Sequence, residues 1–429
     1  MDVLPTEILI DILSRLSVNS ACCIRCVSKV LLKTVDDLSF ATLHMRRLPD
    51  VHQVPRLIRL VEPTFDVHKM YPLKYDGIDL TKSKHAIVSK FVSNLRWYKP
   101  NFVFYNLFGF TGLHTKKGRS CLLVNPFKGE VLMLPTTSDL QVPVNSLCNS
   151  DKYGMGFDNM TNTYKIVRVS CHEKDIKTQV AAEVFILGTS SWRELPSVPP
   201  CHLTRKSACA HGDMHWLVRG DDHDSSFVRI LSFNFKKEEF YWTPHPATSQ
   251  KMHDMFDFVN LLNFRGSLTL VDASSSEDMK IWKLKNYDNK EWVLNYKIDM
   301  QQHPSLRYLK GTLVMCRTLF SICGEWEHGI FFNQDNFVLF LDVTRVIVSS
   351  VRLKGSESVS TGSTVHSCTD NMISLKKYGD LVEAEQDIES PMSGESYENL
   401  IRTAEASGRD VVYLRTQTEP ACTSCDANC

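Results

Sequence analysis

The most restrictive feature of this sequence is a tryptophan that recurs at a constant interval. Trp192, Trp242 and Trp292 are separated by 50 residues each, and each follows an apolar run and a polar turn. The runs are short and rich in β-branched and aromatic residues, which is typical of β-strands. A period near 50 residues in a β-rich chain predicts a propeller, in which neighbouring sheets cover each other's apolar faces. Chance spacing in a β-sandwich is the alternative.

Further stretches extend this pattern. Residues 125–135 resemble an earlier unit without its tryptophan, and residues 341–348 resemble a later one. Helical periodicity is scarce between residues 101 and 353. Its best examples, where we expect helices, are residues 83–95 and residues 254–264. We therefore expect a mainly-β domain in the middle of the chain.

The composition excludes several classes of protein. With 429 residues, 43% hydrophobic and 23% charged, the chain is of ordinary globular composition and long enough for two or three domains. Lys plus Arg equals Asp plus Glu at 49 each, so we expect no attraction to nucleic acid or to an anionic membrane. No apolar run approaches the ~18 residues of a membrane span. The acidic N-terminus and 14 scattered cysteines favour a reducing compartment, the cytoplasm and/or the nucleus.

The first 40 residues carry a different periodicity. Apolar residues recur there at spacings of three and four, which predicts an amphipathic helix: Ile8, Leu9, Ile12, Leu13 and Leu16. Pro5 suits the first helical turn, and either Ser17 or Asn19 can cap a second helix. A third short helix ending near residue 38 is expected. From periodicity alone, the first helix could simply cover the core of its own domain.

These N-terminal residues resemble the F-box. The resemblance lies in Leu4-Pro5-x-Glu7-Ile8-x-x-Asp11-Ile12-Leu13-x-Arg15-Leu16, followed by Ile24-Arg25-Cys26-Val27-Ser28-Lys29. It implies docking on a Skp-type adaptor, which joins a cullin scaffold. The implied adaptor contacts are Leu4, Pro5, Glu7, Ile8, Leu9, Ile12, Leu13, Leu16, Cys26 and Val27. Ser17, Leu31 and Leu38 depart from the Pro, Trp and Pro that the family commonly has, which could weaken the docking.

The middle of the chain looks like the F-box-associated domain of plant F-box proteins, over roughly residues 95 to 350. Residues 153–158, 184–193 and 212–217 carry this resemblance, together with the unit at 125–135. The family is kelch-related, but the double glycine of a kelch blade is missing. We expect Gly154, Gly156 and Asp158 to form a tight turn and the tryptophans to pack between blades.

Substrate-binding residues stay unknown at this level. Loops at the blade ends are the usual place for such contacts, so residues 221–226 and 273–278 are candidates, although ordinary solvated turns are the better explanation of both.

The sequence contains no motif that predicts catalysis. His211 and His215 have metal-ligand spacing only on a helix, whereas the local pattern is β. Cys422, Cys425 and Cys429 lack a second pair at zinc-ribbon spacing. No nucleophile elbow, P-loop, dinucleotide fingerprint or zinc-protease motif is present. We expect no catalytic residue, no metal and no cofactor.

The sequence thus predicts an α+β multidomain protein: a three-helix F-box at 2–45, a linker with a helical segment at 46–94, a propeller-like domain at 95–353 and a polar, mostly disordered tail at 354–429. The function that the resemblance implies is non-catalytic: recruiting an unidentified protein to a Skp-cullin-F-box ubiquitin ligase. The alternative is a propeller that only binds a partner, with an F-box that has lost the adaptor.

Overall fold

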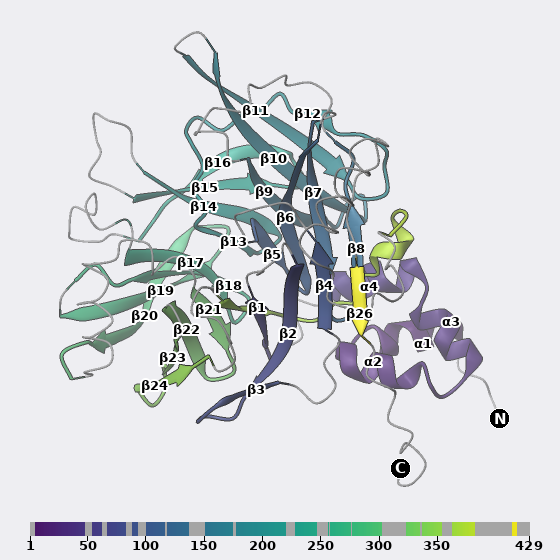
Figure 1. Cartoon of the computed structure of the whole chain (residues 1–429), viewed down its shortest axis with the longest axis horizontal. Coiled ribbons are helices and arrows are strands. Elements are labelled where there is room, and N and C mark those ends of the chain that lie inside the picture. The colour runs from purple at the N-terminus through teal and green to yellow at the C-terminus, as the bar shows by residue number, and fades with distance from the viewer. Residues whose placement is uncertain are drawn as a thin grey trace, which may run out of the picture.

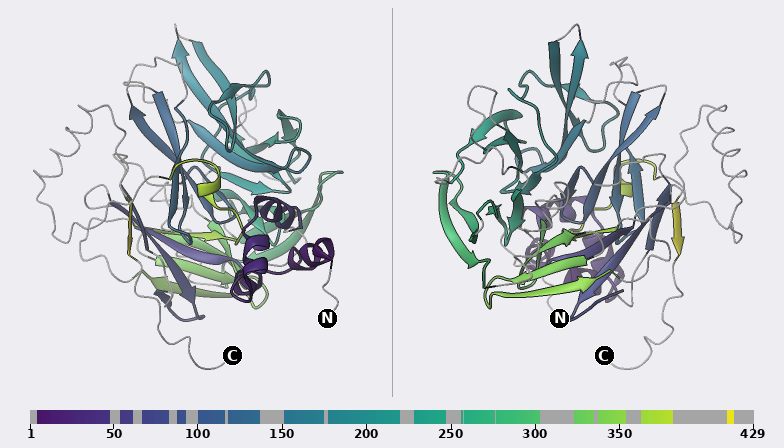
Figure 2. Two further views of the ribbon diagram at one scale, coloured as in Figure 1. Left: turned by 90° about the vertical axis from the view of Figure 1, so that its right-hand side faces the viewer. Right: turned by 60° about the vertical axis from the view of Figure 1, so that its left-hand side comes forward.

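The computed structural model contains a helical N-terminal segment packed against a ring of β-sheets (Figures 1 and 2). It describes residues 5–47, 54–61, 67–82, 88–92, 100–115, 118–136, 151–174, 177–219, 228–246, 256, 258–275, 277–302, 323–334, 337–353, 363–381 and 414–417.

Four short helices follow each other at the N-terminus: α1 (Thr6–Leu13), α2 (Val18–Ile24), α3 (Lys29–Val35) and α4 (Leu38–Arg47). Ser17 and Ser28 cap α2 and α3, because each hydroxyl accepts a hydrogen bond of 3.2 Å from the backbone N–H three residues on. The prediction of three helices is not confirmed. Asp37 accepts a bond of 2.7 Å from the N–H of Ser39, and a fourth helix follows that buries Phe40.

Six sheets form the blades, and five of them have four strands in sequence order. These are β5 (Phe102–Phe104), β6 (Leu107–Thr115), β7 (Gly118–Asn125) and β8 (Glu130–Met133); β9 (Lys152–Asp158), β10 (Thr163–Lys174), β11 (Lys177–Ile186) and β12 (Arg193–Glu194); β13 (Ser207–Ala210), β14 (Asp213–Arg219), β15 (Val228–Asn234) and β16 (Glu239–Thr243); β17 (Val259–Phe264), β18 (Ser267–Asp272), β19 (Asp278–Asn286) and β20 (Glu291–Asp299); and β21 (Cys323–Trp326), β22 (Gly329–Gln334), β23 (Phe337–Asp342) and β24 (Ile347–Arg352).

The remaining sheet joins both ends of the chain and closes the ring. Its strands are β25 (Ser363–Cys368), β1 (Arg56–Val61), β2 (Val67–Tyr75), β4 (Val88–Val92) and β26 (Leu414–Gln417), with β3 (Leu80–Lys82) paired to β2. β25 pairs antiparallel with β1, from Arg56 opposite Cys368 to Val61 opposite Ser363. It lies beside β21, so a late strand completes a blade that the early strands begin. Closure in this way leaves no open gap between the first and last blades.

The observed strands correct two predictions of helices. Residues 46–94 are not a linker with a helix, because they contribute β1 to β4, and β4 lies inside the expected helix 83–95. The expected helix at 254–264 is likewise wrong, since it contains β17. The tail 354–429 contributes β25 and β26. Short apolar runs fit a helix and a strand equally well, so pairing with distant strands decides between them.

One turn recurs in all five sequential blades. An Asn or Asp side chain accepts hydrogen bonds from backbone N–H groups two or three residues later, and the fourth residue after it has a positive φ. The accepting residue and the residue of positive φ are, blade by blade, Asn125 and Gly129, Asp158 and Asn162, Asn234 and Glu238, Asn286 and Lys290, and Asp342 and Val346. The turn thus explains part of the observed repeat.

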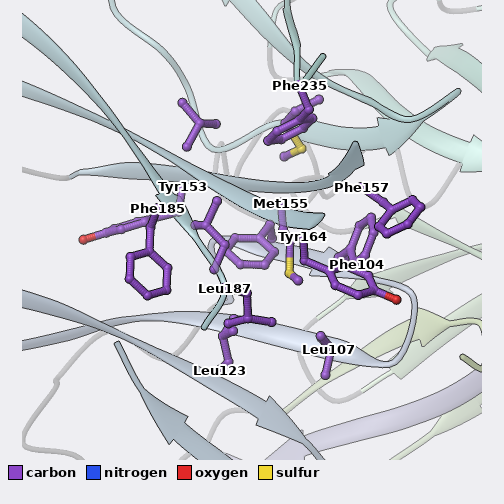
Figure 3. Packing of buried hydrophobic residues seen from close by; sticks show 14 of the residues in the cluster. Phe104, Leu107, Leu123, Tyr153, Met155, Phe157, Tyr164, Phe185, Leu187 and Phe235 are labelled. Carbon is purple, nitrogen blue, oxygen red and sulfur yellow. The ribbon is translucent and has the colours of Figure 1, made fainter. Parts of the chain in front are cut away.

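The glycines at 154 and 156 have another role than the predicted turn. Both lie within β9, and only Asp158 takes part in the turn that follows. A Cβ on Gly156 would come within 2.1 Å of the Phe235 ring of the next blade. Figure 3 shows the apolar packing here, with Phe235 above the strand that carries Met155 and Phe157. These glycines let neighbouring blades approach closely.

Two of the three repeating tryptophans pack between blades as predicted. The indole N–H of Trp192 donates to Pro135 O at 2.8 Å, and that of Trp292 donates to Pro244 O at 2.7 Å. Each acceptor belongs to the segment that leaves the preceding blade. Trp242 instead stacks within its own blade, with the Arg229 guanidinium 3.7 Å from the centre of its ring.

Candidate functional site

The four helices pack on one side of the propeller (Figure 2). Antiparallel strands place two hairpin turns of each blade, first-to-second and third-to-fourth, at the same end, and we call that side the turn face. Arg46 of α4 donates to the carbonyl of Asn159, in the β9–β10 turn, at 2.8 Å. Leu13, Ala21 and Phe40 belong to one apolar cluster with blade residues such as Tyr164. The helices therefore share a core with the propeller.

The outer side of the helices carries unusually exposed apolar side chains. Ile8 and Ile12, one turn apart on α1, are 50% and 48% exposed. Val27, after α2, is 73% exposed, and Val30 and Leu32 of α3 are also exposed. Several aliphatic groups in water on one small helical unit are typical of a protein-binding surface.

Charged groups hold α1 against α4 behind this surface. Arg47 Nη1 donates to the carbonyl of Asp11 at 2.9 Å, and Arg47 also pairs with the Asp11 carboxylate. Hydrogen bonds from Arg15 and Arg47 lower the pKa of Asp11. His44 Nε2 lies 2.9 Å from Leu16 O, and burial lowers the pKa of this imidazole. The helices are thus fixed relative to each other before any partner binds.

The two candidate histidines are occupied by structural contacts. His215 is buried, with Nδ1 2.7 Å from Ser232 Oγ and Nε2 3.2 Å from Ala210 O, and burial lowers its pKa to about 3. His211 Nε2 accepts a hydrogen bond from the N–H of Leu268 at 3.3 Å. Among the described residues, no three His, Cys, Asp or Glu side chains are grouped to hold a metal ion. Cys422, Cys425 and Cys429 lie outside the described residues.

None of the helices in the described part of the chain has the length and apolar character needed to cross a bilayer.

Comparison with known families assigns both parts of the chain. The model of the F-box associated beta propeller domain matches residues 79–375, and that of the F-box domain matches residues 1–43. This chain is an F-box protein of the F-box-associated β-propeller family. The F-box and the propeller expected from the sequence are both confirmed.

Several F-box proteins of Arabidopsis thaliana resemble this chain along most of its length. F-box protein At1g52495 is 24% identical over 371 residues, covering 82% of each chain. F-box protein At3g07870 is 27% identical over 333 residues, covering 70% of this chain and 73% of its own. F-box protein CPR1 is 23% identical over 308 residues, covering 67% and 71%. A solved α-L-arabinanase of Penicillium chrysogenum aligns over 76% of this chain and 100% of its own, but the TM-score of 0.32 and the identity of 9% are too low to define the fold.

The residues predicted to contact the adaptor fall into two groups by their exposure to solvent. The exposed group consists of Pro5, Glu7, Ile8, Ile12, Cys26 and Val27. Leu9 and Leu16 are partly buried against the core, and Leu13 is 4% exposed inside it. Leu4 lies outside the described residues. The inward residues support the helix from behind.

Sequence reasoning missed two residues of the exposed F-box surface, Val30 and Leu32. The available signal was the composition of α3, where Val30, Leu31 and Leu32 follow each other. A helix of seven residues on a surface cannot bury three successive apolar side chains, since they point in different directions. At least one had to face solvent.

Of the two loops considered for substrate, residues 221–226 lie outside the described residues. In the other, Ala273 and Ser274 are buried, and Ser274 N donates to Asp272 at 3.0 Å. Residues 273–275 follow β18, the second strand of its blade, at the end opposite the turn face.

Proposed function

We propose that this F-box protein is the substrate-recognition subunit of a Skp-cullin-F-box ubiquitin ligase. The observation that carries the proposal is the exposed apolar surface of Ile8, Ile12, Val27, Val30 and Leu32 on an F-box that is otherwise packed against its own propeller. Burying one such side chain against a partner contributes about 1.5 to 3 kcal/mol. A Skp-type adaptor would cover this surface and link the chain to a cullin.

Two of the three departures from the F-box pattern, Ser17 and Leu31, do not belong to the exposed apolar surface. Ser17 caps α2 through its bond to Ser20 N, so it starts a helix as the usual proline would. Leu31 is partly buried against the core cluster, where it replaces a larger Trp. Residue 38 begins α4. This favours a functional F-box over a propeller that has lost its adaptor.

The propeller would hold the protein to be ubiquitinated. Such a receptor needs no reactive group, because it accelerates transfer by raising the effective concentration of a target lysine near a ubiquitin thioester carried elsewhere. Because the F-box packs on the turn face, the substrate would bind at the opposite side of the propeller. We expect this assembly in the cytoplasm and/or the nucleus.

The test is binding of purified Skp-type adaptor to the full chain and to the double variant Ile8→Ala, Ile12→Ala. We expect the variant to lose affinity at least tenfold, since central anchors of an interface cost roughly 2 kcal/mol or more when truncated. The control is Ile78→Ala, Met160→Ala, which removes two exposed apolar side chains from the propeller instead.

Equal binding by parent and F-box variant would refute the proposed contact surface. No binding by the parent chain would favour the non-ligase interaction protein.

A further inference from the structure

The chain does not leave the propeller after its last blade strand but crosses the turn face. We call residues 369–378, which follow β25 and include the short 3-10 helix η4 (Leu375–Lys377), the strap. Asn371, Ile373 and Leu375 are each at most 2% exposed. The strap begins beside the β25–β1 pair, passes β8 and ends with Tyr378 packed edge-on against Tyr164 of β10. It therefore spans three blades.

Two charged residues of one turn hold the strap. Lys128 Nζ donates to the carbonyls of Met372 at 3.2 Å and Ile373 at 2.9 Å. The carboxylate of Glu130, which is buried, accepts from Ser374 Oγ at 2.7 Å and from the N–H of Leu375 at 2.6 Å. Hydrogen bonds to charged groups are roughly twice as strong as those between neutral groups.

The strap and the F-box both pack into one apolar cluster. Met372, Ile373 and Leu375 share one apolar cluster with F-box residues that include Val35 and Phe40. The charge of Lys128 acts on Asp36 and Arg25 of the F-box, and loss of hydration here lowers the pKa of Lys128. The strap thus lies at the junction of the F-box and the propeller.

A second blade carries the same residues without these contacts. In the turn that Asn234 begins, Lys237 and Glu239 occupy the positions that Lys128 and Glu130 occupy after Asn125. Lys237 and Glu239 are both exposed. The two pairs have the same residue types in the same kind of turn. They differ because the strap and the F-box cover Lys128 and Glu130 but not Lys237 and Glu239.

We propose that Lys128 and Glu130 are positioning residues which, through the strap, lock the F-box in one orientation on the propeller. The consequence for ubiquitin transfer rests on the proposed function: a fixed F-box holds the substrate at a constant distance from the adaptor, which keeps its effective concentration high. The lock itself is a property of the chain alone.

The experiment compares the full-length parent with the double variant Lys128→Met, Glu130→Gln and with the matched control Lys237→Met, Glu239→Gln. Spin labels carried by an unnatural amino acid at exposed positions Lys33 and Glu194 report the distance from F-box to propeller. Hydrogen exchange reports the N–H of Leu375. We expect a broadened distance distribution and roughly tenfold or faster exchange in the strap variant only.

Milder variants guard against misfolding. Ser374→Ala removes one donor to Glu130, so exchange of the Leu375 N–H should be faster than in the parent but slower than in the strap variant. Lys128→Arg keeps a charged donor, so its distance distribution should stay as narrow as that of the parent. A narrow distribution with slow exchange in the strap variant would overturn the proposal, as would equal changes in the control. Adaptor binding is measured in parallel. If neither the parent nor any variant binds the adaptor, the proposed function fails, while the distance distributions still test whether the strap fixes the F-box on the propeller.

Discussion

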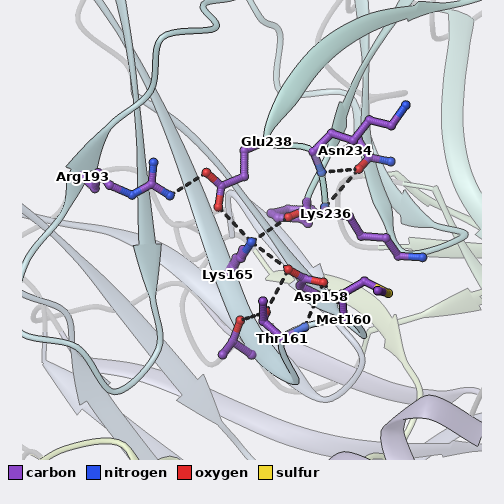
Figure 4. A network of polar contacts seen from close by, with 11 residues as sticks. Asp158, Met160, Thr161, Lys165, Arg193, Asn234, Lys236 and Glu238 are labelled. Carbon is purple, nitrogen blue, oxygen red and sulfur yellow. Dashed lines mark hydrogen bonds and ion pairs between the residues drawn. The ribbon is translucent and has the colours of Figure 1, made fainter.

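Lys165 is the residue that most clearly joins two blades by charge. Its Nζ, in β10, lies 2.9 Å from Asp158 Oδ2 in its own blade and 2.8 Å from Glu238 Oε1 in the next (Figure 4). It also donates to Phe235 O at 3.0 Å. The Lys165 side chain is 6% exposed, so these bonds replace its lost hydration. Removing one partner would leave a buried charge uncompensated.

This cluster predicts a pH dependence of stability. Burial alone would raise the pKa of Asp158, but the hydrogen bond from Lys165 and those of the turn lower it from 3.8 to about 2. A lowered pKa stabilises the folded state above pH ~4, and that stabilisation, roughly 2 kcal/mol, is lost as the pH falls toward 2.

The measurement is urea unfolding of the parent and of Asp158→Asn between pH 7 and pH 2. Asn is chosen because its side-chain oxygen can still accept the turn hydrogen bonds. The difference in free energy of unfolding should shrink below pH ~4. A difference that stays constant over this range would contradict the assignment.

At the scale of elements, ring closure depends on more than the pairing of β25 with β1. Asn333 of β22 donates from Nδ2 to Val365 O at 2.8 Å and accepts at Oδ1 from Val365 N at 2.6 Å. One side-chain amide therefore imitates a strand neighbour and ties the last sequential blade to β25. Val365 is completely buried, so water cannot replace these bonds.

We predict that Asn333→Ala lowers the free energy of unfolding by roughly 2–4 kcal/mol, because two buried backbone groups lose their partner. The matched control is Asn263→Ala, since the exposed Asn263 makes one inter-blade bond, to Cys209 O at 3.1 Å, and should cost about 1 kcal/mol or less. Chemical denaturation measures both. Equal losses would show that Asn333 has no special part in closure.

At the scale of the whole molecule, the F-box on the turn face separates two surfaces. Apolar side chains of α1 and α3 are exposed on the F-box, while the second strand of each sequential blade ends at the opposite side of the propeller. A partner at one surface does not cover the other, which suits a protein that would hold an adaptor and a substrate together.

This separation predicts the footprint of the adaptor. Addition of a Skp-type adaptor should slow hydrogen exchange in α1 to α3 and leave strands such as β14 and β18 unchanged. Exchange mass spectrometry on the full chain measures this. Protection of β14 or β18 instead would place the adaptor on the propeller.

The sequence by itself determined the features that depend on neighbouring residues. Apolar spacing between Ile8 and Leu16 defined the first helix, and the 50-residue interval between Trp192 and Trp292 indicated blades, because both patterns repeat locally. Only the tertiary structure decided that β1 to β4 form a blade with β25, that residues 369–378 cross the turn face, and that Leu13 faces inward while Val30 faces solvent. These outcomes depend on contacts between residues hundreds of positions apart, and no local periodicity records which distant surface covers a given apolar side chain.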